Sequence, residues 1–491
     1  MKKGEIMKTF NIFAIVSLAA LIIAPAVAFA FDAPGEVWVR TWGLGNDDWG
    51  EDVAVDNAGN VYVVGNHYDG SANNWETLKY DADGNLLWSK EYDSGGDDMV
   101  SAVDVDIFGN VYVVGWTEDG SIHDWRYIKY DWDGNLLWNK IRDWGGDVDN
   151  RCHDVVIAEG NIMFMVGDYI HNGTWDYLTV KCDLDGTLIG ENGWSGGGTV
   201  NNNGSAIALD PAGYIYVAGT VYNATADWGI VKYNASNLNL VWNMVFDSGA
   251  DDHLPSSSIA VDDNTGDVYA VGWVDDATID WEMVKYNSAG AQQWYKINDW
   301  GNNEGAWGVE VDTAGDVYVN GDYDAGGTEH WNSRTMKYDP DGNVIWGIDY
   351  NYIDNDAGRG ITLDDSGYVY VVGHSFRTSD VDFLTIKYTQ NGTGIEGNSG
   401  TAEVAVSPNP FTDSATISFA VISAEPANIS VYSMSGRLVK ILLDNESLDG
   451  STHSIQWNGV NANGNRVPPG VYLCRFTNGD TNITRRMVMI R

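Results

Sequence analysis

The chain has 491 residues, with 70 Asp and Glu against 27 Lys and Arg, so its formal net charge at pH 7 is −43. This charge excludes a nucleic-acid binder, which needs a basic footprint, and it disfavours docking to an anionic membrane. Three cysteines exclude a disulfide scaffold, while 22 Trp and a hydrophobic content of 44% exclude a disordered chain.

The first thirty residues have the pattern of an export signal. Three lysines precede or begin an apolar run over residues 12–27, and the run ends in the small-x-small sequence Ala28-Phe29-Ala30. A membrane anchor is the alternative, because the run approaches the length that spans a bilayer. Pro25 and the small-x-small ending favour cleavage near Ala30 and a secreted or outer-surface chain, with no transmembrane anchor in its mature form.

Charge and tryptophan divide the remaining chain in two. Residues 403–491 contain seven acidic and seven basic residues, so the whole excess of negative charge lies upstream. Only Trp457 lies in this stretch, and the segment 391–402 has the Gly- and Ser-containing composition of a flexible linker. We therefore expect a signal peptide at 1–30, a large domain at 31–390, a linker at 391–402 and a small domain at 403–491.

The large domain is built from seven sequence repeats. An apolar segment ending in glycine, such as Val61-Tyr-Val-Val-Gly65, recurs with its glycine at positions 65, 115, 167, 219, 272, 321 and 373. A lysine followed by an aromatic residue or, once, by cysteine also recurs seven times, at positions 79, 129, 181, 232, 285, 337 and 387. Self-similarity at this period predicts a propeller or a solenoid.

Each repeat has the pattern of four short strands. In the first repeat these are residues 52–56, 60–65, 75–80 and 85–92, joined by Asp/Asn/Gly turns such as Asp81-Ala-Asp-Gly84. Such turns supply the positive φ that tight hairpins require. Four antiparallel strands of this length are typical of one propeller blade.

The two ends of the repeat region predict a closed ring. The fourth strand carries a tryptophan in most repeats, at positions 88, 138, 242, 294 and 346, but the seventh repeat has no fourth strand. The segment 36–42 (EVWVRTW) resembles the fourth strand at 86–92 (LLWSKEY). We predict an all-β fold in which residues 36–42 complete the last blade and close a seven-bladed β-propeller, because closure removes exposed sheet edges.

The repeat over residues 36–390 resembles the secreted bacterial seven-bladed propeller repeat, on the pattern AVAVD, VYVVG and KYD-x-x-G-x-x-x-W. The Gly-His and Trp-Asp punctuation of WD40 repeats is missing. The stretch 403–491 contains Ser407-Pro-Asn-Pro-Phe411, Gly464-Asn-Arg-Val-Pro-Pro-Gly470 and Arg485-Arg-Met-Val-Met-Ile490 in this order. It resembles the immunoglobulin-like C-terminal sorting domain of type IX secretion cargo, related to the FlgD Ig-like domain, which implies the type IX secretion machinery as a partner.

In a propeller, the loops before strand one and between strands two and three lie on the same rim. Here the first loop set carries acidic residues, and the second ends in a repeated tryptophan. The candidate cation ligands are Asp48, Asp98, Asp252, Glu304 and Asp356. The candidate ligand-stacking residues are Trp75, Trp125, Trp175, Trp228, Trp281 and Trp331, while the seventh repeat has Asp380 and Asp382 in this region.

These repeated residues have a structural interpretation and a functional one. The acids either cap loop amides or bind calcium, the one candidate cofactor, because hard divalent cations prefer oxygen ligands. The tryptophans either fill the space between blades or stack on a polysaccharide or on a surface protein. A binding scaffold that uses this Asp- and Trp-rich rim is the predicted function.

Catalysis is the weaker interpretation. The sequence has no G-x-S-x-G, H-E-x-x-H or P-loop motif, so no catalytic residue is assigned. A polysaccharide lyase or glycosidase with acid and base from different blades is the alternative function. The third repeat breaks the pattern most, with Cys152 and Cys182, and would hold a unique pocket; the two cysteines either pair or remain free thiols.

Overall fold

The computed structural model describes residues 34–390 apart from 121, 144–148, 159, 172, 197–200, 277, 325, 327–330, 352–354 and 377–379. It also describes residues 404–490 apart from 408–410, 413, 421–425, 434–436, 447, 449–451, 463 and 479–480. Within these ranges every regular element is a β-strand, which confirms the all-β prediction. The predicted signal peptide and linker lie outside the described residues.

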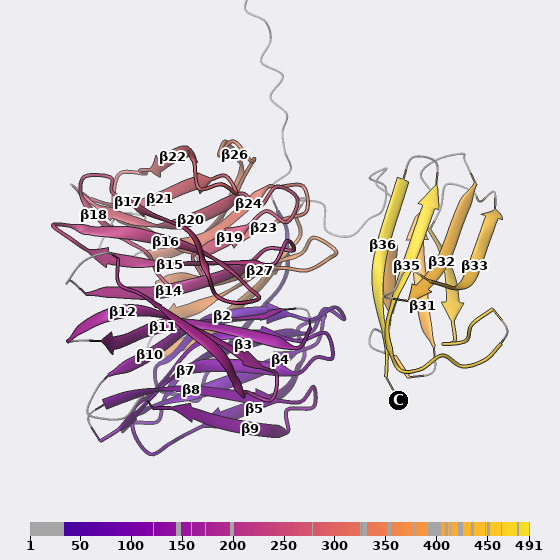
Figure 1. The fold of residues 1–491 in the computed structure, drawn as a ribbon, viewed down its shortest axis with the longest axis horizontal. Helices are drawn as coiled ribbons and strands as arrows, with labels where there is room; N and C mark the ends of the chain where they lie inside the picture. Colours follow the sequence, from indigo (N-terminus) through magenta and orange to yellow (C-terminus); the bar gives the residue numbers. More distant parts are fainter. Residues whose placement is uncertain are drawn as a thin grey trace, which may run out of the picture. The chain divides into compact units, whose positions relative to one another are not determined.

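Residues 36–388 form seven antiparallel sheets, which we number 1 to 7 in chain order (Figure 1). Sheets 1–3 contain β2 (Asp48–Val55), β3 (Val61–Tyr68), β4 (Asn73–Tyr80), β5 (Leu86–Tyr92); β6 (Asp98–Val105), β7 (Val111–Asp119), β8 (Ile122–Tyr130), β9 (Leu136–Arg142); and β10 (Asn150–Ala158), β11 (Ile162–His171), β12 (Thr174–Asp183), β13 (Leu188–Trp194). Sheets 4 and 5 contain β14 (Asn202–Leu209), β15 (Tyr214–Tyr222), β16 (Ala226–Asn234), β17 (Leu240–Phe246); and β18 (Asp251–His253), β19 (Ile259–Val261), β20 (Val268–Asp275), β21 (Ile279–Tyr286), β22 (Gln292–Asn298). Sheets 6 and 7 contain β23 (Glu304–Val311), β24 (Val317–Asp324), β25 (Trp331–Tyr338), β26 (Val344–Tyr350); and β27 (Asp356–Leu363), β28 (Val369–Phe376), β29 (Val381–Tyr388), β1 (Glu36–Trp42).

The fourth strand of sheet 7 comes from the beginning of the described chain. β1 pairs antiparallel with β29, with Trp38 opposite Lys387 and Trp42 opposite Phe383. The predicted pairing of residues 36–42 with the last sheet is therefore confirmed. Sheet 1 also contacts sheet 7 directly, because β2 packs against β27, β28 and β29.

The repeated strand-four tryptophan and the repeated strand-three lysine of one sheet bind the same carbonyl oxygen of the next sheet. We call this pair of hydrogen bonds the latch. The strand-four Trp88 donates from its indole N–H to the carbonyl of Trp132, in a turn of the next sheet, and the strand-three Lys79 donates to the same oxygen. Trp138 and Lys129 share the carbonyl of Leu184 in the same way. Further pairs are Trp242 with Lys232 on Ser288, and Trp294 with Lys285 on Pro340.

The same latch joins the last sheet to the first. Trp38 donates its indole N–H to the carbonyl of Ala82 at 3.1 Å, and Lys387 donates to that oxygen, also at 3.1 Å. The turn glycine Gly84 has φ +77°, and a Cβ on it would lie 2.8 Å from the Trp38 ring. Glycine is therefore required at this turn both for its backbone conformation and for the packing of the indole.

The C-terminal unit contains two sheets that share one apolar core. One sheet has β30 (Val404–Ser407), β31 (Ala415–Ala420) and β34 (Thr452–Trp457); the other has β33 (Leu438–Glu446), β32 (Ala427–Ser433), β35 (Gly470–Asn478) and β36 (Thr481–Met489). Ile417 and Trp457 from the first sheet pack with Ile429 and Phe476 from the second. The alternating strands of the sequence thus bury one face of each sheet.

All three cysteines are buried free thiols. Cys152 and Cys182 both belong to the core of sheets 2 and 3, and burial raises the pKa of Cys182 to about 11. A thiol with such a pKa stays protonated at neutral pH and is a poor nucleophile. A disulfide and two free thiols were the alternatives for Cys152 and Cys182, and the structure has two free thiols.

Candidate functional site

Four of the six tryptophans expected to face a ligand lie in the core. These are Trp75, Trp125, Trp228 and Trp281, each at most 1% exposed. Each covers the strand-two glycine of the next sheet; a Cβ on Gly115, for example, would lie 2.8 Å from the Trp75 ring. A ring covered in this way offers no face to a ligand, and these four tryptophans fill the space between neighbouring sheets.

Trp175 and Trp331 occupy a different position and are only half-buried. They precede the strand-three lysine by six residues, whereas the four core tryptophans precede it by four. Tyr177 and Ser333 stand at the core position of sheets 3 and 6, and Phe383 stands there in sheet 7. The different spacing, which is visible in the sequence, separates the two kinds of tryptophan.

The first strand of six sheets contains a β-bulge near its middle. The residues inserted there are Glu51, Ser101, His153, Ser205 and Trp307, and the pair Arg359 and Gly360 in sheet 7. These side chains differ in charge, size and polarity although the strands around them repeat. Because a bulge re-aims a side chain, this position is where a repeated architecture acquires an asymmetric site.

The residue after the strand-two glycine is the second variable position. It is Asn66, Trp116, Asp168, Thr220, Trp273, Asp322 and His374 in sheets 1–7. In the ladder it pairs with the residue two positions before the one inserted at the bulge, as Met99 pairs with Trp116 and Gly305 with Asp322. The sequence analysis missed these two positions because it considered only residues that repeat. When the seven repeats are aligned on their strand-two glycines, these are positions at which the residue type varies.

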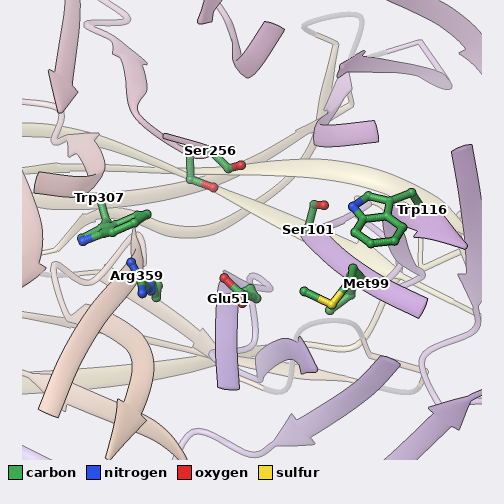
Figure 2. Close-up of a pocket in the computed structure, with 9 residues that line it drawn as sticks. Glu51, Met99, Ser101, Trp116, Ser256, Trp307 and Arg359 are labelled. Atoms are coloured by element: carbon green, nitrogen blue, oxygen red, sulfur yellow. The ribbon is translucent and has the colours of Figure 1, made fainter. Parts of the chain in front are cut away.

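Two cavities are lined by residues at these variable positions. The smaller, of about 180 Å³, is lined by Glu51, Met99, Val100, Ser101, Trp116, Ser256, Ser257, Trp307 and Arg359. Figure 2 shows Trp307 and Trp116 on opposite sides of it, with Glu51 between them. The larger, of about 490 Å³, includes Trp273, Trp331, Asp322, His374 and Phe376. Both cavities share Trp307 and Arg359, so one wall separates them.

The shared wall is a stack of flat groups. The Arg359 guanidinium carbon lies 3.5 Å from the centre of the Trp307 ring, and the Trp307 and Trp273 ring centroids are 4.9 Å apart. His253 stacks on Trp273 with a centroid distance of 5.5 Å. Stacking between rings and a cation adds to the energy of burial and holds the indoles in place.

Buried charge surrounds this wall. Burial raises the pKa of Asp322 to about 6, although the nearby Arg359 lowers it. Burial also raises the pKa of Glu51, and Arg359 again acts in the opposite direction. Burial first, and Arg359 second, lower the pKa of His374 to about 3, so its imidazole is neutral at neutral pH.

Several polar groups that line the larger cavity have no hydrogen-bond partner among the described residues. Two of them are the Nδ1 of His374, whose residue is only 6% exposed, and the Nη1 of Arg359. A buried polar group without a partner costs free energy unless a ligand or water satisfies it. These two groups therefore mark the larger cavity as a site with unused hydrogen-bonding capacity.

The five predicted cation ligands are fully buried, each at the beginning of a first strand. Asp48, Asp98 and Asp252 each accept a backbone N–H from the residue four positions earlier, at 2.9, 2.7 and 2.9 Å. These hydrogen bonds cap loop amides, which is one of the two roles expected from the sequence. The five lie in five different sheets and do not gather into one site.

Two of the five nevertheless belong to carboxylate triads formed with the preceding sheet. Asp252 joins Asp227 and Asp247, and Glu304 joins Asp280 and Asp299. In each triad, one carboxylate oxygen of every residue lies within 4.8 Å of the other two. Within the described residues, Asp48, Asp98 and Asp356 belong to no such triad.

Two His–Asp pairs lie in sheet 3 and at its junction with sheet 2. His153 Nε2 lies 3.1 Å from Asp168, and His123 Nδ1 lies 3.0 Å from Asp149. The Trp116 ring packs against His123 at 4.3 Å. Neither His–Asp pair lines one of the two cavities described above, although Trp116 does.

The inner strands also carry carboxyl groups that bind backbone amides of the next sheet. Asp52 accepts from the Val103 N–H, and Asp104 accepts from the Ile157 N–H. Burial raises the pKa of both aspartates to about 7. Because this pKa exceeds that of the unfolded chain, the folded state holds extra protons, and its stability is lost as the pH rises through about 7.

We expect Asp104→Asn to leave the free energy of unfolding unchanged at pH 5 and to raise it by about 1–2 kcal/mol at pH 8. The amide keeps an acceptor for the Ile157 N–H but has no charge to bury. Urea unfolding at both pH values measures this. Asp133→Asn, in an exposed turn, is the control and should show no pH-dependent gain; an equal effect of both substitutions would contradict the burial argument.

Comparison with known sequences identifies two segments. Residues 405–490 match the family described as secretion system C-terminal sorting domain, and residues 37–66 match the family described as β-propeller repeat. The chain thus combines a β-propeller repeat with a type IX sorting domain, which confirms the resemblance seen in the sequence. No curated protein matches the chain.

Solved structures similar to this chain include three with 9% identity. The β-propeller domain of the Trilobed protease from Pyrococcus furiosus has a TM-score of 0.43 and covers 72% of this chain and 100% of its own. Sqt1 from Chaetomium thermophilum has a TM-score of 0.42 and covers 73% and 99%. The acylaminoacyl peptidase of Pyrococcus horikoshii has a TM-score of 0.42 and covers 77% and 59%. Identities and TM-scores at this level transfer no role.

None of the residues that the structure describes belongs to a helix with the length and hydrophobicity needed to cross a bilayer.

Proposed function

We propose that this protein is exported and binds a neutral saccharide chain at the two cavities that share Trp307 and Arg359. The observation that carries the proposal is the larger cavity, of about 490 Å³, where half-buried indoles stand beside hydrogen-bonding groups without partners. Its volume falls within the range of known small-molecule sites. Indole faces stack on sugar rings, while carboxylates and the guanidinium bind hydroxyl groups.

The charges favour a neutral ligand over an acidic one. Glu51, Glu304 and Asp322 surround the single guanidinium of Arg359 in the two linings. The net charge of −43 also repels an approaching polyanion at low ionic strength. A polyuronate or a sulfated chain therefore fits this site less well than a neutral glycan.

The proposal includes the architecture that holds the site. The seven sheets are the blades of one closed propeller, supported by the β1–β29 ladder and by the latch from Trp38 and Lys387 to Ala82. The C-terminal unit is an immunoglobulin-like domain, supported by its two sheets on one core. This unit directs the chain through type IX secretion to the outer surface or the medium, which its family match supports.

Binding can be tested with the purified mature chain on arrays of neutral glycans, acidic glycans and peptides. We expect neutral glycans to bind, and Trp273→Ala to weaken that binding at least tenfold, because the substitution removes one stacked face of the wall. Isothermal titration calorimetry on the best glycan gives the affinities. The control is Trp132→Ala, whose ring is 54% exposed in a strand-three-to-four turn.

Three outcomes would contradict the proposal. Selective binding of peptides would make the cavity a peptide site, and equal effects of Trp273→Ala and Trp132→Ala would place the glycan elsewhere. Shortening of the bound glycan during incubation would support the lyase or glycosidase alternative, in which the site is catalytic.

A further inference from the structure

The two carboxylate triads lie at equivalent places between successive sheets. In the triad of sheets 5 and 6, Asp280 lies on β21, Asp299 directly follows β22, and Glu304 begins β23. In the triad of sheets 4 and 5, Asp227 lies on β16, Asp247 follows β17, and Asp252 lies on β18. Each triad thus takes two carboxylates from one sheet and one from the next.

Hydrogen bonds satisfy only part of the first triad. Asp280 accepts from the Thr278 hydroxyl at 3.2 Å, and Asp299 accepts from the Gly301 N–H at 2.7 Å. Glu304 accepts from the Asn302 N–H at 3.3 Å through Oε1, but its buried Oε2 has no hydrogen-bond partner among the described residues. Glu304 is 0% exposed, so an unsatisfied carboxylate oxygen at this position costs free energy unless a ligand or a bound water satisfies it.

A further buried carboxyl lies beside the second triad. Glu282 is 0% exposed, and the groups that interact with it are the Tyr295 hydroxyl and Asp252, although neither contact gives a carboxylate oxygen of Glu282 a hydrogen bond of good geometry. In the described part of the chain, no Lys, Arg or His forms an ion pair with any member of either triad. Three neighbouring carboxylates with no cation repel one another, and burial strengthens the repulsion.

The geometry points to a divalent-cation site at each triad, with calcium as its ion. Oxygens within 4.8 Å of one another can all reach one ion at the calcium–oxygen distance of about 2.4 Å. Carboxylates without nitrogen or sulfur ligands select a hard cation, and a ligand set drawn from three separate elements suits the irregular coordination of calcium better than the octahedron of magnesium. Asp247 and Asp299 are exposed and leave each site open to the solvent for entry of the ion.

This inference corrects the ligand set that the sequence predicted. The acid that begins the first strand binds together with two carboxylates of the preceding sheet, and only at the two junctions where all three positions are acidic. At the junction of sheets 6 and 7, the equivalent residues are Asn332, Asn351 and Asp356, with one carboxylate among them. That junction is therefore a natural negative control.

The test uses the full mature chain, stripped of metal with a chelator, and does not require a saccharide. Equilibrium dialysis should give about two calcium ions per chain. Terbium should displace calcium and luminesce when the indoles are excited, because Trp281 and Trp300 flank the first triad and Trp228 follows Asp227 in sequence. Magnesium should compete at least tenfold less well than calcium.

The variants assign the sites. Asp299→Asn changes an exposed side chain and keeps an acceptor for the Gly301 N–H, so we expect a folded chain that loses one calcium or binds it at least tenfold more weakly. Asp247→Asn should do the same to the second ion, and the double variant should lose both. Asp356→Asn, at the control junction, should still bind both ions.

The inference is wrong if the stripped chain binds no calcium, or if Asp299→Asn and Asp247→Asn bind it like the unmodified chain. An equal loss on Asp356→Asn would show nonspecific attraction of cations to an acidic surface, which would also overturn it. Circular dichroism of each variant separates a lost site from a lost fold. Because calcium binding is measured without glycan, its failure and failure of the saccharide proposal are distinguishable.

Discussion

Replacing Trp38 by alanine should lower the free energy of unfolding of the repeat region by about 3–5 kcal/mol, the usual cost of truncating a buried tryptophan. The Trp38 ring is 7% exposed and contacts Tyr80 of sheet 1 and Tyr370 of sheet 7, with centroid distances of 6.2 and 6.3 Å. Its indole N–H also donates to Ala82. The substitution therefore removes both packing and a hydrogen bond between the first and last sheets.

The matched variant is Trp88→Ala, at the junction of sheets 1 and 2. Trp88 donates to the Trp132 carbonyl at 3.3 Å and packs between Tyr62 and Tyr130 with centroid distances of 6.2 and 6.3 Å. In a closed ring the two junctions are equivalent, so urea unfolding should give both variants similar losses. If Trp38→Ala costs less than about 1 kcal/mol while Trp88→Ala costs several, the ring is open.

Replacing Arg359 by methionine should lower the free energy of unfolding by about 3 kcal/mol at pH 8 and by much less at pH 5. The guanidinium lowers the pKa of the buried carboxyl groups of Asp322 and Glu51. Without it, the pKa of each carboxyl rises further above that of the unfolded chain. Stability is then kept at acidic pH, where the groups are protonated, and lost as the pH rises.

Arg334→Met is the control for this variant. Arg334 also lies over a tryptophan, 4.5 Å from the Trp300 centroid, but it pairs at 2.6 Å with Asp349, whose side chain is 37% exposed. Burial raises the pKa of Asp349, but its hydrogen bonds to Arg334 and Tyr323 and the charge of Arg334 together lower this pKa below its usual value, so the carboxylate is ionised at both pH values. We expect a loss of about 1 kcal/mol that is the same at pH 5 and pH 8. A pH-independent loss for Arg359→Met would contradict the proposed coupling.

The repeat period and the strand pattern are readable from the sequence because they arise from local chemistry. Alternating apolar residues and Asp-x-x-Gly turns specify hairpins within a few residues of one another. The similarity of residues 36–42 to residues 86–92 even predicted the ladder between β1 and β29, although 338 residues lie between Trp42 and Val381. A repeat makes such a long-range pairing visible, because the partner of each strand is known from the other copies.

The role of each tryptophan was harder to predict from the sequence, because an indole ring can either pack in a core or stack on a ligand. Trp75 and Trp331 both stand near the start of strand three, yet one is buried over Gly115 and the other lines a cavity. The spacing to the following lysine distinguishes them, four residues against six. That spacing acquires its meaning only when the register of strand three against its neighbours is known, because the register decides which residue lies over the glycine of the next sheet.

By itself, the sequence determined the all-β class, the repeated unit and the C-terminal sorting domain, since each depends on patterns within a short stretch of chain. Only the tertiary structure decided which side chains meet. The bulges bring Glu51, Trp307 and Arg359 from three sheets to neighbouring walls, and the sheet junctions join Glu304 to Asp280 and Asp299. Both arrangements depend on how one sheet packs against the next, and such distances across the fold are not encoded in any single repeat.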